Sequence, residues 1–299
     1  MNAGGAGNYN PTYRANAFGA TIMSLNDNTW TVYDTANLRM ASHSYGWGVS
    51  GGYWAAARDH DQQMRLQPQM MHFYSSGNQG SDTCNYGTYN GIGGWANLTG
   101  GAKQAKNLMA INNTSPFDSL SFGSVGPAFD GRIKPDLCIE GLEGTSYSSP
   151  KGAGMMAQLY QAWKSLHAGA NPPSALIKAF MLNSADELYT PGPDFRTGYG
   201  RINIRRAYKD LVANQYWEDS VSNNGNKQFQ LAIPANVEKV KIMLYWHDYE
   251  ATVMPQKPSS IILTLPFNLQ QVQFTIRGFS IFIRIPTVWT ILRIGAWIP

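Results

Sequence analysis

The chain has 299 residues and a mass of 33.0 kDa, a length that allows one large domain and a small second one. Charged residues make up only 14% of it, and 30 glycines, 16 tyrosines and 9 tryptophans are typical of a loop-rich globular protein rather than a disordered one. The net charge of +4 comes from scattered Lys and Arg without a basic run, so we expect no nucleic-acid partner.

Simple patterns exclude further features. Cys84 and Cys138 are too few for a disulfide framework and lack the paired spacing of a zinc site. No stretch of membrane-spanning length is free of polar residues, so we expect no membrane partner. Residues 1–20 lack the charged start and apolar middle of a signal peptide.

Short apolar segments alternate with helical patterns through residue 213. The segments predict strands at 20–24, 38–42, 70–76, 105–111 and 137–139. Helical spacing predicts helices at 53–64, behind Ser146, after Pro172 and Pro173, and from Ile204 to Leu211. This alternation predicts an α/β domain with a mainly parallel sheet and helices on both faces.

The pattern changes after Tyr216. Apolar residues alternate with polar ones at Phe229 to Ile233 and again from Val240 to Trp246, which predicts the start of an antiparallel β-sandwich. From residue 251 onward there is no Asp or Glu, and no clear period, as expected for a frame-shifted end. We therefore divide the chain into an α/β domain at 1–213 and an incomplete β-sandwich at 214–299, with a non-native tail after about 251.

The segment from Gly144 to Gly154 is rich in small residues and precedes an apolar helical pattern. Ser146 is therefore expected at a helix N-terminus, where N–H groups and the helix dipole favour an oxygen that gains negative charge. That environment suits an acyl-transfer nucleophile. A serine that only caps a buried helix would explain the same local sequence.

Two other loops favour the functional interpretation. Tyr45 and Gly46 follow one predicted strand, and Gly77 and Asn78 follow another. The carboxyl ends of parallel strands lie at one edge of a sheet, so these loops and Ser146 are expected to converge where ligands bind.

The run Asp59-His60-Asp61 has the residue types of a metal site or a proton relay. Adjacent residues on a helix do not face one another, however, so we interpret the run as a solvated helix surface.

Several motifs together resemble the subtilisin-like serine proteases, over residues 1 to about 250. Gly144-Thr145-Ser146-Tyr147-Ser148-Ser149-Pro150 resembles the nucleophile segment of that family, and Ser75-Ser76-Gly77-Asn78 resembles its oxyanion-hole segment. His43-Ser44-Tyr45-Gly46 is similar to its substrate-binding edge, and 121–136 to the stretch before the serine. The segment 216–248 is similar to the β-sandwich appended to some bacterial members.

The resemblance implies specific roles. Ser146 would be the nucleophile, and the amide of Asn78, with the backbone N–H of Ser146, would bind the oxyanion. The backbone of an extended polypeptide substrate would pair with Ser44, Tyr45, Gly46, Ser76 and Gly77. The family also implies an extracellular or cell-surface protein. We expect a monomer with no cofactor required for the chemistry, and structural calcium is common in the family although no ligand cluster identifies its residues.

Two departures from the family limit this expectation. The family uses the chain order Asp, His, Ser, and none of the five histidines here fits the base, so the chain is expected to lack the catalytic Asp and His segments at its start. Only Leu142 and Glu143 stand between Gly141 and Gly144, where the family has a longer stretch, so the aim of Ser146 would be altered.

The sequence thus predicts a serine endopeptidase in its complete form and an inactive chain as it stands. An alternative is a non-catalytic relative that binds extended peptide or carbohydrate. An unrelated esterase fits less well, because Gly-Thr-Ser-Tyr-Ser lacks the Gly-x-Ser-x-Gly elbow.

Overall fold

A computed structural model describes most of the chain. The described residues are 14–24, 33, 37–115, 122–141, 144–189, 191–220, 226–230, 239–253, 270–276, 279–285 and 290–297.

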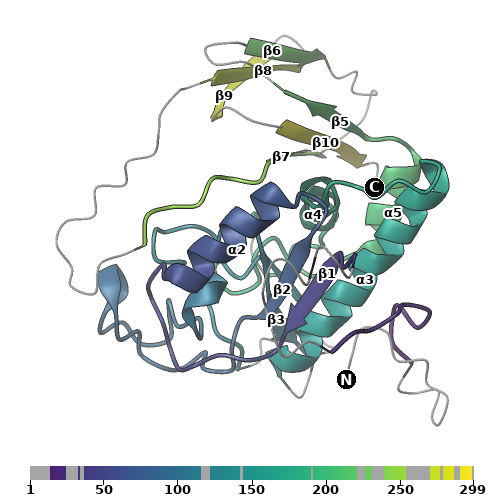
Figure 1. Cartoon of the computed structure of the whole chain (residues 1–299). Coiled ribbons are helices and arrows are strands. Elements are labelled where there is room, and N and C mark those ends of the chain that lie inside the picture. The colour runs from purple at the N-terminus through teal and green to yellow at the C-terminus, as the bar shows by residue number, and fades with distance from the viewer. Residues whose placement is uncertain are drawn as a thin grey trace.

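A four-stranded parallel sheet is the centre of the molecule (Figure 1). Its order is β1-β2-β3-β4, with parallel pairing between every neighbouring pair. The strands are β1 (Met40–His43), β2 (Met71–Ser75), β3 (Met109–Thr114) and β4 (Leu137–Glu140). Every residue of β2 and β3 is buried, as expected for central parallel strands covered on both faces. The predicted α/β class with a mainly parallel sheet is confirmed.

Helices cover the sheet on both sides. The long helix α3 (Thr145–Leu166) crosses all four strands, while α2 (Ala55–Leu66) lies on the opposite side (Figure 1). Two shorter helices, α4 (Ser174–Asn183) and α5 (Ile204–Val212), pack against α3. The core between these layers contains apolar side chains such as Phe73, Ile111 and Leu159, each worth about 1.5–3 kcal/mol when fully buried.

A buried ion cluster joins the sheet to α4. The carboxylate of Asp136, just before β4, lies 2.5 Å from the Lys134 ammonium and 3.0 Å from that of Lys178 on α4. It also accepts a hydrogen bond from the backbone N–H of Ala110 in β3 (2.7 Å). Burial alone would raise the pKa of Asp136, but the two ammonium groups hold that pKa below its usual range. Asp136 is therefore a charged core residue.

The remaining strands form two three-stranded sheets. One has the order β5-β10-β7 and the other β6-β8-β9. Their bounds are β5 (Tyr216–Asp219), β6 (Asn226–Gln230), β7 (Lys239–Tyr245), β8 (Gln270–Ile276), β9 (Phe279–Ile285) and β10 (Thr290–Trp297). Two of these strands, β7 and β10, contact α4. That 214–299 forms an incomplete β-sandwich domain, with a non-native tail after about 251, stays a prediction.

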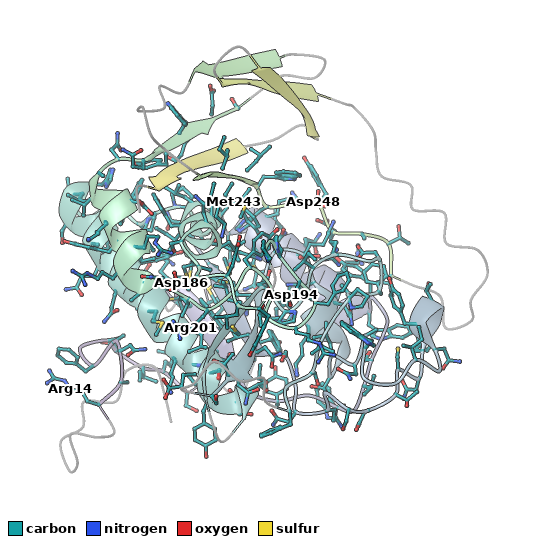
Figure 2. The ribbon with its side chains drawn as sticks, turned by 180° about the vertical axis from the view of Figure 1, so that it is seen from behind. Arg14, Asp186, Asp194, Arg201, Met243 and Asp248 are labelled. Carbon is teal, nitrogen blue, oxygen red and sulfur yellow. The ribbon has the colours of Figure 1, made fainter. Side chains whose placement is uncertain are left out.

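The segment after β7 is fastened to the α/β layers. The Lys106 ammonium contacts the Asp248 carboxylate at 2.7 Å, and Arg65 on α2 pairs with Glu250 at 3.1 Å. The Nδ1–H of His247 donates to the carbonyl of Met64 at the end of α2 (2.9 Å). Figure 2 shows Asp248, and Met243 within β7, on the side of the α/β layers that faces the additional strands.

Two sequence-based strand predictions were wrong in detail. Residues 20–24 are not a strand, and Ile22 and Met23 are half exposed because no described strand lies beside them to bury them. The predicted strand at 105–111 begins only at Met109. Its expected first residues are diverted because the backbone N–H groups of Lys106 and Asn107 donate to the carboxylate of Asp61.

The interpretation of Asp59-His60-Asp61 as a solvated surface was also wrong, except for Asp59, which is exposed. Asp61 is fully buried, and accepts hydrogen bonds from the Tyr53 hydroxyl (2.7 Å) and from the N–H groups of Lys106 (3.0 Å) and Asn107 (2.7 Å). Burial raises the pKa of Asp61, although these donors oppose the shift. Asp59 and Asp61 lie on different faces of α2, one exposed and one buried. The three-residue run alone does not show which face is buried.

No disulfide joins Cys84 and Cys138, which are both buried. Among the described residues there is no helix with the length and apolar character that a membrane span requires.

Replacing Asp61 with alanine is expected to lower the free energy of unfolding by about 3 kcal/mol or more, because two buried donors and one part-buried donor lose their acceptor. The matched control Asp59→Ala changes an exposed carboxylate on the same helix and should cost no more than about 0.5 kcal/mol. Urea unfolding measures both values. Equal effects of the two substitutions would contradict the buried role of Asp61.

His247 is expected to make the fold sensitive to acid. Burial, with a contribution from Lys178, lowers the pKa of His247 to about 3. The folded state therefore binds fewer protons than the unfolded state between pH 3 and about 6.5, so stability is full above that window and is lost as the pH falls through it. The His247→Gln variant should show a shallower pH dependence of unfolding free energy, by up to about 1.4 kcal/mol per pH unit. Identical slopes for variant and parent would refute this assignment.

Candidate active site

The loops that follow β1, β2 and β4 meet at one edge of the sheet. Ser44, directly after β1, donates its hydroxyl to the carbonyl of Ser146 (2.9 Å). The Ser146 hydroxyl in turn donates to the carbonyl of Ser44 (3.4 Å). Two predicted site residues 102 positions apart are thus in reciprocal contact, because parallel strands place their carboxyl ends together.

Asn78 is held by the residue before Ser146. Its Oδ1 atom accepts hydrogen bonds from the backbone N–H (3.0 Å) and the hydroxyl (2.9 Å) of Thr145. That orientation leaves the Nδ2 group as the donor, and a Cβ atom on Gly144 would lie only 3.1 Å from it. Gly144 also has a φ of +128°, which favours glycine. The structure therefore places an amide donor beside the N-terminus of α3.

Ser146 is the second residue of α3 and is half-buried. Gly144 is the N-cap residue, so the alternative in which Ser146 only caps the helix is wrong. The first-turn N–H groups and the positive end of a 22-residue helix dipole lie around Ser146. An oxyanion formed there would be stabilised electrostatically.

The other predicted substrate-binding residues differ in exposure. Tyr45 and Gly46 are exposed after β1, whereas Ser76 and Gly77 are buried after β2. Gly77 has a φ of +118° and its backbone N–H donates to the Thr145 hydroxyl (3.2 Å). The exposed backbone at this site thus belongs to the Ser44 loop, and Gly77 instead positions Thr145.

None of the five histidines, all of which lie in the described part of the chain, hydrogen-bonds the Ser146 hydroxyl. His167 and His247 bond to backbone carbonyls of Trp163 and Met64. The other three, His43, His60 and His72, contact one another. Within the described part of the chain, the hydroxyl of Ser146 therefore faces the carbonyl of Ser44 and no histidine.

The three clustered histidines were not recognised as a group from the sequence. Burial lowers the pKa of His43 to about 3, with a contribution from His60, and also lowers the pKa of His60 and of His72. All three are therefore neutral imidazoles near pH 7. The one signal in the sequence was a histidine directly after one predicted strand, one within the next and one on the helix between them, and such elements are often neighbours in a parallel sheet.

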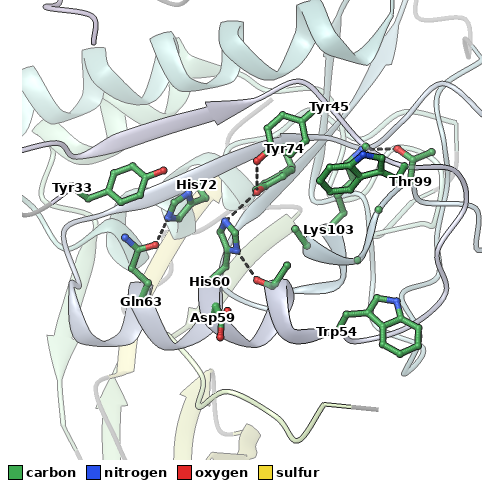
Figure 3. Close-up of a pocket in the computed structure, with 16 residues that line it drawn as sticks. Tyr33, Tyr45, Trp54, Asp59, His60, Gln63, His72, Tyr74, Thr99 and Lys103 are labelled. Carbon is green, nitrogen blue, oxygen red and sulfur yellow. Dashed lines mark hydrogen bonds between the residues drawn. The ribbon is translucent and has the colours of Figure 1, made fainter. Parts of the chain in front are cut away.

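A cavity of about 470 Å³ lies next to this cluster (Figure 3). His60 and His72 line it together with Tyr45, Tyr74 and Lys103. Burial lowers the pKa of Lys103 to about 7, and its ammonium lies 2.5 Å from the Thr99 hydroxyl. The cavity shares Tyr45 and Gly46 with the predicted substrate-binding edge.

A parallel α/β domain with a serine at a helix N-terminus and a carboxamide at a neighbouring strand end is typical of serine hydrolases. The chain belongs to the subtilase family, whose family model matches residues 12–200. The subtilase family is one of serine peptidases, so the match gives the class of protein at the level of the family.

Solved structures of several proteases are similar to the chain at low sequence identity. The prenylagaramide maturation protease PagA shares 16% identity over 60% of this chain and 64% of its own, with a TM-score of 0.47. The patellamide maturation protease PatA shares 17% over 62% and 66%, with a TM-score of 0.47. Tripeptidyl peptidase 2 shares 18% over 89% of this chain and 22% of its own, with a TM-score of 0.45. The chain thus spans about 64% of the length of PagA, and a comparison with curated proteins gave no significant match.

Thr145→Ala is expected to lower the free energy of unfolding by about 1–3 kcal/mol, because the buried N–H of Gly77 loses its acceptor and Asn78 loses a donor. Thr145→Ser retains the hydroxyl and should cost less than half as much. Chemical denaturation of both variants tests this. If serine and alanine were equally destabilising, the hydroxyl would not be the link between Gly77 and Asn78.

Proposed function

We propose that the complete protein is a serine endopeptidase that forms an acyl-enzyme on Ser146, with the catalytic histidine and aspartate supplied by a segment N-terminal to residue 1. The single observation that carries the proposal is the position of Ser146 in the first turn of α3, next to an Asn78 amide oriented by Thr145. The family assignment supports the reaction class.

In the proposed mechanism, Ser146 Oγ attacks the carbonyl carbon of a peptide bond. The histidine takes the hydroxyl proton as the new C–O bond forms, and the carbonyl oxygen becomes an oxyanion. Asn78 Nδ2 and the backbone N–H of Ser146 donate hydrogen bonds to that oxygen. Transfer of the proton to the leaving amine then gives the acyl-enzyme, which water hydrolyses.

The substrate-binding part of the proposal rests on exposed backbone. Ser44, Tyr45 and Gly46 follow the edge strand β1 and are exposed, so an extended peptide has backbone groups available for pairing there. Such pairing tolerates many sequences, because it uses main-chain groups. We also propose an extracellular or cell-surface location and a monomeric state, on the resemblance to the family alone.

The 299-residue chain by itself should be inactive. The Ser146 hydroxyl donates to a backbone carbonyl, and an ordinary serine without a base is a weak nucleophile. The N–H of Gly144 also donates to the carbonyl of Gly141 (3.1 Å), three residues earlier. This short connection would affect the orientation of Ser146.

The test compares this chain with a form extended by the upstream reading frame, using a quenched fluorescent peptide and a fluorophosphonate that labels activated serines. The extended form should cleave the peptide and be labelled at Ser146, whereas the 299-residue chain should do neither. Serine-dependent cleavage by the shorter chain, or an upstream frame without Asp and His motifs, would overturn the proposal.

Substitutions in the extended form separate the roles. Ser146→Ala should abolish turnover, and the control Ser165→Ala, at an exposed position near the end of the same helix, should leave it unchanged. Asn78→Ala should lower kcat by about 10²–10³-fold with little change in KM, the effect known for removing one such donor from a subtilisin. An unchanged kcat would remove Asn78 from the oxyanion site.

A non-catalytic function is the alternative, and it is favoured because none of the five histidines in this chain hydrogen-bonds Ser146. In that case the exposed edge at Ser44 to Gly46 would bind extended peptide or carbohydrate without cleavage. Binding that survives Ser146→Ala in an extended form without turnover would support this alternative over the peptidase.

A further inference from the structure

Three histidines from three different elements come together beneath the sheet edge. His43 ends β1, His72 lies in β2, and His60 lies on α2, which covers that face of the sheet. One ring nitrogen from each lies within 4.8 Å of the other two. Within the described residues, this is the one group of three or more metal-ligating side chains so arranged.

His60 presents an unprotonated nitrogen to the cluster. Its Nδ1 atom lies 2.6 Å from the carbonyl of Ala56, one helical turn earlier. A carbonyl oxygen can only accept, so Nδ1 carries the proton and Nε2 carries the lone pair. At present the Tyr74 hydroxyl, 3.0 Å away, donates to that lone pair (Figure 3).

His72 is held in the same manner by a side chain. Its Nε2 atom lies 2.8 Å from Oε1 of Gln63, and the Gln63 amide nitrogen donates to Gln67 (3.2 Å), which fixes the amide orientation. Nε2 of His72 is therefore the protonated nitrogen, and Nδ1 presents its lone pair. Metal-ligating histidines almost always donate their second ring N–H to a carbonyl or carboxylate in this way.

His43 completes the set. Its Nε2 atom lies 2.9 Å from Nδ1 of His72, so one proton is shared between two nitrogens that could both bind a metal ion. That proton is the only ring proton of neutral His43, and its shift to Nδ1, where the Tyr45 hydroxyl lies 3.3 Å away as an acceptor, frees the lone pair of Nε2. Tetrahedral zinc with Zn–N bonds of about 2.0–2.1 Å needs nitrogens about 3.3 Å apart, so the pair must separate by only a few tenths of an ångström.

The donor set selects the kind of ion. Three neutral imidazoles suit Zn²⁺ and related transition metals, whereas Ca²⁺ and Mg²⁺ require oxygen ligands. The buried carboxylate of Asp61, on the same helix as His60, is bound to Tyr53, Lys106 and Asn107 and is not part of the group. The cavity of about 470 Å³ next to His60 and His72 leaves room for water or an exogenous ligand in a fourth position.

We propose that His43, His60 and His72 form a three-histidine site for Zn²⁺ or a related transition-metal ion, distinct from the serine site. The ion would take the position between His43 Nε2 and His72 Nδ1 once the His43 proton has moved to its Nδ1, and it would bind His60 Nε2 once the Tyr74 hydroxyl proton turns away from that nitrogen. It would join β1, β2 and α2 at one point.

The experiment is a titration of the metal-free 299-residue chain with Zn²⁺ by calorimetry, and with Co²⁺ by visible absorption, which reports tetrahedral coordination. One ion per chain is expected, with a rise in Tm on binding. His60→Ala should weaken Zn²⁺ binding by about 100-fold or more. The control His167→Ala removes a histidine that stacks on Trp163 and should leave the affinity unchanged.

A second variant keeps all three ligands. Gln63→Leu removes only the acceptor on His72 and should weaken binding by about 10–100-fold, as found for partners of metal-ligating histidines. Circular dichroism verifies that each variant is folded. No binding by the parent chain, or a Zn²⁺ affinity equal in His60→Ala and His167→Ala, would overturn the proposal. Peptidase assays do not enter this test, so its outcome is independent of the proposed function.

Discussion

The carboxylate of Asp136 is the contact on which the arrangement of the α/β layers most depends. Two buried ammonium groups neutralise it, and it also accepts a hydrogen bond from the backbone N–H of Ala110 in β3. Lys178 adds hydrogen bonds to the carbonyls of Asn107 (3.1 Å) and Leu108 (2.8 Å), just before β3 begins. Removing one partner of such a buried cluster costs about 3–5 kcal/mol, because the remaining charge is left without compensation. The start of β4, the start of β3 and the position of α4 are thus determined together.

That constraint leads directly to the serine site. Asp136 precedes β4, β4 ends at Glu140, and α3 begins at Thr145, so the cluster determines where the nucleophile segment starts. At the other end of the same layers, Thr145 binds both Gly77 and Asn78. Two polar contacts, one charged and one neutral, therefore position the candidate active site.

Much of the fold could be predicted from the sequence, because buried strands and amphipathic helices have a period that is local. β2, β4 and α2 begin within two residues of their predicted starts. The failures concern side chains whose partners are distant in the chain. The burial of Asp61 depends on Lys106 and Asn107, more than 40 residues later, and residues 20–24 lack the neighbouring strand that their apolar pattern required.

The residues of the candidate sites likewise fall into those that local sequence reveals and those that depend on distant partners. Ser146 and Asn78 were recognisable because each lies in a motif with its own local sequence, whereas His43, His60 and His72 come from three separate segments that share no common motif. Their grouping follows from strand pairing, since His43 lies opposite Tyr74 in the parallel register of β1 and β2, and His72 lies two residues before it. A single sequence does not encode that register.

The end of β1 has a wider consequence. His43 turns toward the histidine cluster, while Ser44, the next residue, turns toward Ser146. Successive residues of an extended chain point to opposite sides, so one peptide bond separates two chemically unrelated environments. A shift of β1 by one residue against β2 would exchange their orientations and disrupt both at once. The register of the four-residue edge strand β1 against β2 therefore positions both sites. An insertion or deletion in β1 cannot alter one of the two sites alone.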